Sequence, residues 1–189
     1  MFLSDEVYRF VEHDPADRLP NAADVSATAV SLGVMSKSLG LAGLRIGWIA
    51  TRDAAVGARV RAMKDYLTIS PSAPSEVLAL IGLRAREAVL ARTRGIVRRN
   101  MALLDEAFAD WDGLVDWVRP TAGPVGFPRF LRGPGAEAAA DDLLRDEGVL
   151  ILPGTVFGGH PDRFRIGFGR EGFAEALAGF ERWLRRRLI

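Results

Sequence analysis

The sequence predicts an α/β fold, because apolar segments typical of strands alternate with helix-like segments along the chain. Of the 189 residues, 49% are hydrophobic and 26% are charged, which provides enough apolar material for a sizeable core. This length suits one medium domain or two small ones. The alternation predicts either an α/β fold throughout or an α/β part followed by a small α+β lobe, with the seam between the lobes in a helix near Asn100–Trp111.

Charge and residue usage exclude several classes of protein. Lys and Arg number 25 against 24 Asp and Glu, and a net charge of +1 argues against a nucleic-acid binder. The chain has no cysteine, which rules out disulfides, thiolate zinc sites and a cysteine nucleophile. With only His13 and His160 as histidines, we expect no metal site. No apolar run reaches the length of a bilayer and the first residues lack the build of a signal peptide, so we expect a soluble, cytoplasmic protein without a membrane partner.

Three apolar segments in the first half predict strands. Met1–Leu3 resembles the end of a buried strand, Ala29–Met35 is a continuous apolar run, and Leu44–Ala50 follows a glycine-rich interruption. A helix is predicted over Ala54–Tyr66. The polar segment His13–Asp24 contains two prolines, which predicts a surface loop or a short helix.

A long helical region is predicted after these strands. Ser72 is a credible N-cap, with Pro74 and Glu76 in the first turn, where each residue type is favoured. In the second part of the region, apolar residues recur at steps of four and three, which predicts one buried stripe used for packing. The stripe consists of Val97, Met101, Leu104, Phe108 and Trp111.

Short elements are predicted beyond Gly113. The strands are expected at residues 114–118, 125–131, 149–152 and 163–168, and a helix at residues 137–147. A closing helix places Phe173, Leu177, Phe180, Leu184 and Leu188 on one face. The arginine run at residues 185–187 is interpreted as a solvated helix end that the helix dipole favours.

The segment between the second and third predicted strands contains a lysine flanked by two serines, Ser36-Lys37-Ser38. Burial of an ammonium group is costly and lowers its pKa, which makes a desolvated lysine suitable for forming an imine with an aldehyde. Arg45 follows past two glycines and could hold a phosphate group in its fork. A surface turn with a solvated lysine and arginine explains the same pattern, and spacing alone does not separate the two interpretations.

Two further polar groups stand at predicted strand positions. Asp5 follows the first strand, where α/β folds place ligand-binding groups, and Tyr8 comes one helical turn later. An N-capping aspartate and a packed tyrosine would explain this pair equally simply.

Arg165 lies between Phe164 and Ile166 on an alternating strand, beside the small Gly167. It could bind a carboxylate with two hydrogen bonds, or it could be an ordinary exposed arginine.

Taken in order, these motifs resemble the class I/II aminotransferases, which are fold-type I enzymes that use pyridoxal 5′-phosphate. The motifs are Asp5-Glu6-Val7-Tyr8, the block from Ser36 to Trp48, Leu152-Pro153-Gly154, Phe157-Gly158 and Phe164-Arg165-Ile166. The resemblance covers essentially the whole chain, and the lysine block is its most specific part. It implies that residues 1–99 are the C-terminal part of a three-layer α/β/α large domain that binds the cofactor, and that residues 100–189 are the small α+β domain.

The resemblance also implies roles for individual residues in cofactor binding. Lys37 looks like the lysine that holds pyridoxal 5′-phosphate through an imine and then moves the proton. Asp5 resembles the carboxylate that pairs with the pyridine nitrogen, which keeps the ring an electron sink. Tyr8 is similar to the tyrosine that hydrogen-bonds the phenolic oxygen of the cofactor. Arg45 and Ser36 resemble the residues that contact the phosphate.

For the substrate, Arg165 matches the arginine that binds the α-carboxylate. The implied reaction is amino-group transfer from an amino acid to a 2-oxo acid in amino acid metabolism and biosynthesis, by a homodimer. Some members of the fold catalyse decarboxylation, elimination or cyclisation instead, and these motifs do not separate such reactions. The family often has a serine where this chain has Val34, which removes one phosphate contact. The motifs do not indicate which amino acid is the substrate.

The resemblance begins at a motif that lies in the second half of such enzymes. We therefore expect this chain to correspond to the C-terminal half, without the glycine-containing phosphate loop, the residue that stacks on the ring, and the asparagine near the phenolic oxygen. Two hypotheses follow from this expectation. The chain is either a fragment or split half of a working aminotransferase, with little activity alone, or a catalytically silent remnant that acts as a binding or oligomerisation module.

Overall fold

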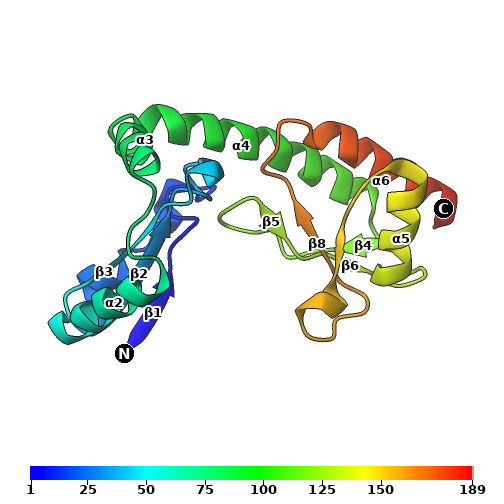
Figure 1. Cartoon of the computed structure of the whole chain (residues 1–189). Coiled ribbons are helices and arrows are strands. Elements are labelled where there is room, and N and C mark those ends of the chain that lie inside the picture. The colour runs from blue at the N-terminus through cyan, green and yellow to red at the C-terminus, as the bar shows by residue number, and fades with distance from the viewer. Residues whose placement is uncertain (189) are drawn as a thin grey trace. The chain divides into compact units, whose positions relative to one another are not determined.

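The structure is a computed structural model that describes residues 1–188 (Figure 1). The chain divides into two compact units, Met1–Arg94 and a second unit that starts at Gly95. Both helices and strands are present in each unit, so the predicted α/β class is confirmed. Across the described residues, no helix is both long and apolar enough to cross a membrane.

The first unit contains a three-stranded sheet with helices before and after its last strand. Its elements are β1 (Phe2–Asp5), the 3₁₀ helix Pro15–Asp17, α1 (Ala22–Val25), β2 (Ala29–Val34), the 3₁₀ helix Ala42–Leu44, β3 (Gly47–Thr51), α2 (Ala54–Leu67) and α3 (Ala73–Arg84). Helix α4 (Arg86–Asp110) begins in this unit and continues into the second. Residues 13–24 therefore form the loop with short helices that the prolines predict.

The sheet has the order β1-β2-β3. Strands β1 and β2 are parallel, whereas β2 and β3 are antiparallel. Strand β2 lies where the sequence predicts it, but β3 begins at Gly47, three residues after the predicted start at Leu44. The reason is local: Ala42–Leu44 forms a 3₁₀ turn that ends at Arg45 in a left-handed conformation (φ 55°), which no strand includes.

Helix α3 packs against the turn that follows β2. Met35, Leu39, Ala79 and Leu90 form the buried cluster of this unit. A Cβ atom at Gly82 would come within 2.8 Å of the Leu41 side chain, so glycine is the residue that lets α3 approach this closely. This packing anchors the segment that carries Lys37. Ser72 is the N-cap of α3 as predicted, although its side chain makes no capping hydrogen bond.

Much of the first unit's apolar surface is not covered by the described residues. Phe2 and Leu3 lie in β1, but the side chains of Met1, Phe2 and Leu3 are all more than 60% exposed, so the predicted burial of this strand end is wrong for this chain. Helix α3 exposes apolar side chains on several sides, namely Val77, Leu78, Leu80, Ile81 and Leu83. A helix that is apolar all round is usually buried in a larger core.

The second unit consists of α4, short strands and two further helices. Its elements are β4 (Val115–Asp116), β5 (Val125–Gly126), β6 (Arg129–Phe130), α5 (Ala136–Glu147), β7 (Leu152–Pro153), the 3₁₀ helix Gly154–Phe157, β8 (Phe164–Gly167) and α6 (Phe173–Arg187). Strands β4 and β6 pair with each other, and β8 lies between β5 and β7. The predicted strand at residues 125–131 is split, because Pro128 lacks the N–H group that a central strand needs. The predicted strand at residues 149–152 is observed only at its last residue, as the start of β7.

Aromatic side chains fill the core of the second unit. Phe164 stacks on Phe130 with ring centroids 4.5 Å apart, and Phe180 lies 5.5 Å from Phe164. The ring of Trp111, the residue directly after α4, lies 5.2 Å from the ring of Phe180. The predicted stripe on α4 is buried, except that Phe108 remains partly exposed. The predicted apolar face of α6 is likewise buried, with Leu188 partly exposed.

Ion pairs join α5 to α6. The Glu147 carboxylate accepts hydrogen bonds from Arg182 and Arg186, at 2.9 and 2.5 Å. Arg187 lies 3.2 Å from the Asp142 carboxylate. All three arginines at residues 185–187 are exposed in the last turn of α6, as predicted, and the guanidinium groups of Arg186 and Arg187 also pair with acids on α5.

Glu147 makes the stability of the second unit depend on pH. The hydrogen bond from Arg186, helped by Arg182, lowers the pKa of Glu147 below its ordinary value of 4.5. A carboxyl with a lowered pKa stabilises the fold above its unfolded-state pKa, and this stabilisation disappears as the pH falls. Glu147→Gln should lower the thermal unfolding midpoint at neutral pH, and the difference from the unaltered chain should shrink below about pH 4. Glu87→Gln, at an exposed acid that pairs with its neighbour Arg86, is the control. A difference that is the same at both pH values would contradict the ion-pair explanation.

Candidate active site

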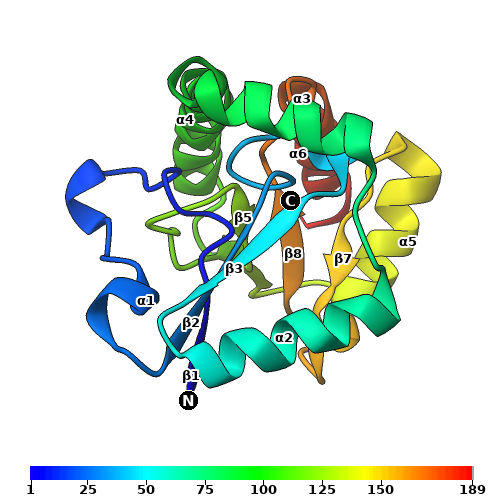
Figure 2. The ribbon, with the colours of Figure 1, turned by 60° about the vertical axis from the view of Figure 1, so that its left-hand side comes forward.

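Figure 2 shows β1, β2 and β3, which form the sheet of the first unit, and most of the predicted site residues lie in the segments at the ends of these strands. Asp5 is the last residue of β1, and Val34 is the last residue of the parallel strand β2. The carboxyl ends of parallel neighbours meet at the same edge. Strand β3 runs the other way and starts at Gly47, which pairs with Val34. The segments that contain Asp5, Lys37 and Arg45 therefore meet at this edge.

Lys37 lies in the turn that follows β2. The turn is fixed by two backbone hydrogen bonds, from Gly40 N to the Lys37 carbonyl and from Leu41 N to the Met35 carbonyl, both 2.9 Å long. Met35 and Leu39 point into the core, whereas the Lys37 side chain is exposed. Of the two interpretations left open by the sequence, the solvated turn is the one observed. An exposed amine keeps its access to an incoming aldehyde.

Tyr8 lies beside Lys37. The Lys37 Nζ atom is 5.9 Å from the centroid of the Tyr8 ring. The two turns that carry these residues are joined directly, because Ser38 N donates a hydrogen bond to the Val7 carbonyl at 3.2 Å. The structure thus brings together two of the predicted site residues that are 29 positions apart in the sequence.

Asp5 caps no helix, in contrast to the alternative interpretation of this residue. Its Oδ1 atom accepts a hydrogen bond from Val7 N at 3.2 Å, which closes a small turn directly after β1. The side chain is exposed at the edge of the sheet. A carboxylate in this position is accessible to a ligand that lies across the strand ends.

Arg45 and Ser36 complete the group. Arg45 adopts the left-handed conformation described above, and its Nη1 atom donates to the Ala42 carbonyl at 3.1 Å. A residue other than glycine in this region costs about 1–2 kcal/mol of backbone energy, and such strain is typical of functional positions. The Arg45 side chain is exposed, and Ser36 is half-buried. Both are polar groups that could contact a phosphate.

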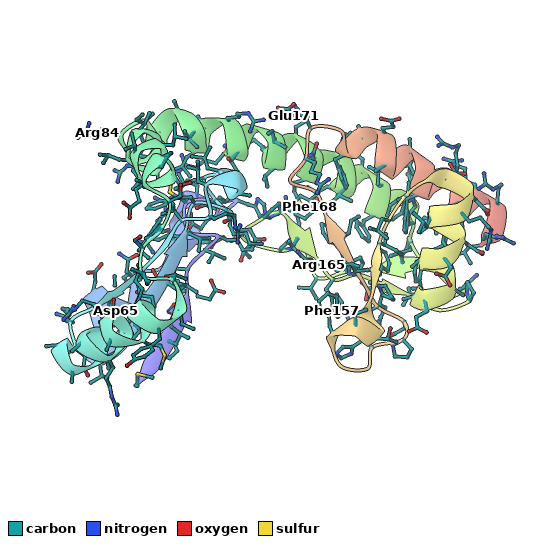
Figure 3. All side chains as sticks on the ribbon, viewed as in Figure 1. Asp65, Arg84, Phe157, Arg165, Phe168 and Glu171 are labelled. Atoms are coloured by element: carbon teal, nitrogen blue, oxygen red, sulfur yellow. The ribbon has the colours of Figure 1, made fainter. Side chains whose placement is uncertain are left out.

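Arg165 belongs to the second unit (Figure 3). On β8 the side chains of Phe164 and Ile166 are buried, and Arg165 is half-buried on the opposite face. This confirms the predicted alternation. Arg165 pairs across the sheet with Leu152 of β7.

A polar network beside the site has no counterpart in the sequence analysis. The Glu6 Oε1 atom accepts hydrogen bonds from Ser31 Oγ at 2.7 Å and from Ala22 N at 2.8 Å. Ser31 is 5% exposed and lies in the middle of β2. A serine inside an otherwise apolar strand is the signal that could have revealed this network.

A cavity of about 340 Å³ lies next to this network. Glu6, Phe10, Ser31, Ser38 and Trp48 are among its lining residues, but Asp5, Tyr8, Lys37 and Arg45 are not. The candidate site is therefore an open edge of the sheet and not this cavity. Among residues 1–188, no three His, Asp or Glu side chains come close enough to hold a metal ion.

Comparison with known proteins identifies the family. Residues 1–178 match the family described as aminotransferase class I and II. The chain belongs to this family. It is 33% identical over 168 residues to capreomycidine synthase from Streptomyces vinaceus, an alignment that covers 89% of this chain and 42% of the relative. It is 34% identical over 161 residues to the arginine–pyruvate transaminase AruH from Pseudomonas aeruginosa, which covers 82% of this chain and 40% of that protein.

Solved structures give the same result for the fold. A PLP-dependent aminotransferase from Streptococcus suis superposes with a TM-score of 0.88 and 30% identity, over 97% of this chain and 48% of that one. The PLP-dependent cyclase OrfR superposes with a TM-score of 0.86, also at 30% identity, over 97% of this chain and 50% of that one. The aminotransferase chain described here thus spans about half the length of the relatives it matches. The fold-type I prediction is confirmed.

The family implies pyridoxal 5′-phosphate as the cofactor. The residues at the sheet edge fit this molecule, because each of its functional groups finds a suitable side chain. The aldehyde suits the amine of Lys37, the pyridine nitrogen suits the carboxylate of Asp5, and the phenolic oxygen suits the hydroxyl of Tyr8. The phosphate suits the guanidinium of Arg45 and the hydroxyl of Ser36.

Proposed function

We propose that this chain supplies the lysine-bearing part of a pyridoxal-phosphate-dependent aminotransferase, which transfers an amino group from an amino acid to a 2-oxo acid. One observation carries the proposal. The strand ends bring Asp5, Lys37 and Arg45 to one edge of the sheet, and Lys37 Nζ lies 5.9 Å from the Tyr8 ring. The family match over residues 1–178 supports the same reaction.

Each residue at the edge would have one task. When bound, pyridoxal 5′-phosphate supplies a carbon that takes up an amino group and a ring that withdraws electrons. The Lys37 amine would hold the cofactor and move the proton at the reacting carbon. The Asp5 carboxylate would accept a hydrogen bond from the protonated ring nitrogen, and the Tyr8 hydroxyl would donate to the ring oxygen. Arg45 and Ser36 would fix the phosphate and thereby orient the ring.

Arg165 would bind the substrate. Its guanidinium can donate two parallel hydrogen bonds to a carboxylate. An amino acid and a 2-oxo acid share the α-carboxylate group, so a single arginine can position both the amino donor and the acceptor. We propose this residue as the carboxylate site of the reaction.

A cyclisation reaction is a second candidate that the comparisons favour specifically. The PLP-dependent cyclase OrfR superposes on this chain with a TM-score of 0.86 at 30% identity. The same lysine, aspartate and tyrosine could serve that reaction. The products separate the two, because transamination forms one 2-oxo acid for each amino acid consumed and cyclisation forms none.

We propose further that residues 1–99 belong to the cofactor-binding large domain and residues 100–189 to the small domain. The division into compact units after Arg94 supports this assignment.

We also propose that the protein acts as a homodimer in the cytoplasm, in amino acid biosynthesis. The exposed apolar side chains of α3 support an association with a further polypeptide.

The test is an assay of amino-group transfer with pyridoxal 5′-phosphate, a panel of amino acids, and 2-oxoglutarate or pyruvate as acceptor. We expect slow turnover by the 189-residue chain alone, since Asp5, Lys37 and Arg45 are open to water. Co-expression with the part of a relative that this chain does not match should raise the rate. Binding of the cofactor without formation of a 2-oxo acid in either arrangement would rule out transamination.

A further inference from the structure

We propose that Glu6 is a positioning residue for the cofactor-binding segment Asp5–Tyr8. It contributes no group to the proposed chemistry. Its side chain instead links the end of β1 to β2 and α1 by hydrogen bonds. These bonds determine the face of the sheet on which the Asp5 side chain lies, and they determine the position of Tyr8. This inference rests on the proposed function of the site.

The Glu6 side chain is held from two elements at once. Its Oε1 atom accepts hydrogen bonds from the Ser31 hydroxyl of β2 and from Ala22 N, the first residue of α1. Ser31 Oγ in turn accepts from Ala23 N at 3.0 Å. Asn21, the N-cap of α1, makes no side-chain capping bond. Glu6 and Ser31 therefore satisfy the helix N–H groups that a cap would otherwise satisfy.

The backbone of Glu6 continues the sheet by one residue beyond β1. Glu6 N donates to the Leu32 carbonyl at 3.0 Å. Neighbouring side chains on a strand point to opposite faces, so anchoring Glu6 on the α1 face directs Asp5 to the other face. A slip of the strand by one residue would exchange the two carboxylates. The anchored glutamate prevents this exchange.

The same residue starts the turn that carries Tyr8. The Glu6 carbonyl accepts a hydrogen bond from Arg9 N at 2.9 Å, which closes the turn around Val7 and Tyr8. The Val7 carbonyl then accepts from Ser38 N in the Lys37 turn. A continuous path of hydrogen bonds thus runs from the Glu6 anchor to both turns of the site.

Glu6→Ala would leave the Ser31 hydroxyl and the Ala22 N–H without their acceptor. We expect it to weaken pyridoxal 5′-phosphate binding by the 189-residue chain by about tenfold or more, the range found when supporting groups around a ligand site are removed. Glu6→Gln keeps an oxygen that accepts both bonds, so it should restore the affinity to within about threefold. Ser31→Ala removes one bond of the anchor and should give an intermediate loss. Glu87→Ala, at an exposed glutamate of α4, is the matched control and should bind normally.

The decisive readout is a double-mutant cycle with Asp5→Ala. If Glu6 acts by positioning Asp5, then Glu6→Ala should cost much less affinity in the Asp5→Ala chain than in the unaltered chain. A role in stability alone would give the same loss in both backgrounds. The affinity is measured by spectroscopic titration with pyridoxal 5′-phosphate, and circular dichroism confirms that each variant is folded. If Glu6→Ala does not fold, Ser31→Ala takes its place in the cycle.

Two results would overturn the inference separately from the proposed function. In the first, the unaltered chain binds the cofactor through Lys37, and the affinity of the Glu6→Ala chain is within twofold of the unaltered chain's. This result would show that Glu6 does not position the site. In the second, Glu6→Ala lowers the affinity by the same factor in the unaltered chain and in the Asp5→Ala chain, which would lead to the same conclusion. If the unaltered chain and Lys37→Ala bind identically, the proposed function fails, and the inference fails with it.

Discussion

Replacing Lys37 by alanine is expected to reduce amino-group transfer by roughly 10³-fold or more, the scale of loss when a covalently acting residue is removed. Lys37 lies in a turn held between buried Met35 and Leu39, so the exchange of an exposed side chain should leave the fold intact. The loss would therefore report on the chemistry and not on folding. The assay is amino-group transfer under the conditions in which the unaltered chain has its highest rate.

Lys64 provides the matched control for this prediction. It is the second of the two lysines in the chain, and it lies near the end of α2, where its Nζ atom donates to the Ile69 carbonyl at 2.8 Å. Lys64→Ala should keep most of the transfer rate. If both alanine variants lose the same fraction of activity, or neither loses any, Lys37 does not have the role proposed for it.

The second large effect is expected for Trp183→Ala, in the second unit. Trp183 is completely buried, with Phe130 and Phe180 at ring-centroid distances of 5.8 and 6.0 Å. Removing a buried aromatic side chain of this size costs about 3–5 kcal/mol, through lost burial and the cavity left behind. Domains of this size are stable by about 5–15 kcal/mol in total, so the variant should lose a large share of its stability.

Denaturant unfolding monitored by circular dichroism measures this loss. Trp48→Ala is the comparison, because Trp48 is 43% exposed on β3 and its removal leaves a smaller buried volume. The unfolding midpoint should fall much further for Trp183→Ala than for Trp48→Ala. Equal midpoints for the two variants would contradict the view that Trp183 is central to the core of the second unit.

The helices of this fold could be predicted from local sequence because their signals are local. The period of α4 depends on residues three and four apart, and α3 begins with a proline and a glutamate at favoured positions. The start of β3 could not be predicted in the same way. Its apolar run begins before Arg45, and the 3₁₀ turn Ala42–Leu44, which ends in the left-handed conformation of Arg45, delays the strand to Gly47.

The motifs indicate which segments the candidate site brings together, but they do not indicate the environment of its side chains. The motifs name Asp5, Tyr8, Lys37 and Arg45, and the parallel pairing of β1 with β2 explains how distant segments meet. The exposure of Lys37 depends on which parts of a protein pack around it, and this information is not contained in its neighbours in the sequence. The bond between Glu6 and Ser31 joins residues 25 positions apart, which is beyond the reach of any local pattern.

The position of the reduced imine tests the central claim most directly. The 189-residue chain is incubated with pyridoxal 5′-phosphate, reduced with borohydride and digested, and the labelled peptide is identified by mass spectrometry. Lys37, Lys64 and the amino group of Met1 are the amines that can be labelled. We predict saturable labelling of Lys37, little labelling of the other two amines, and loss of the label in Lys37→Ala. Labelling spread evenly over the three amines, or unchanged in Lys37→Ala, would contradict the assignment of this sheet edge as the cofactor site.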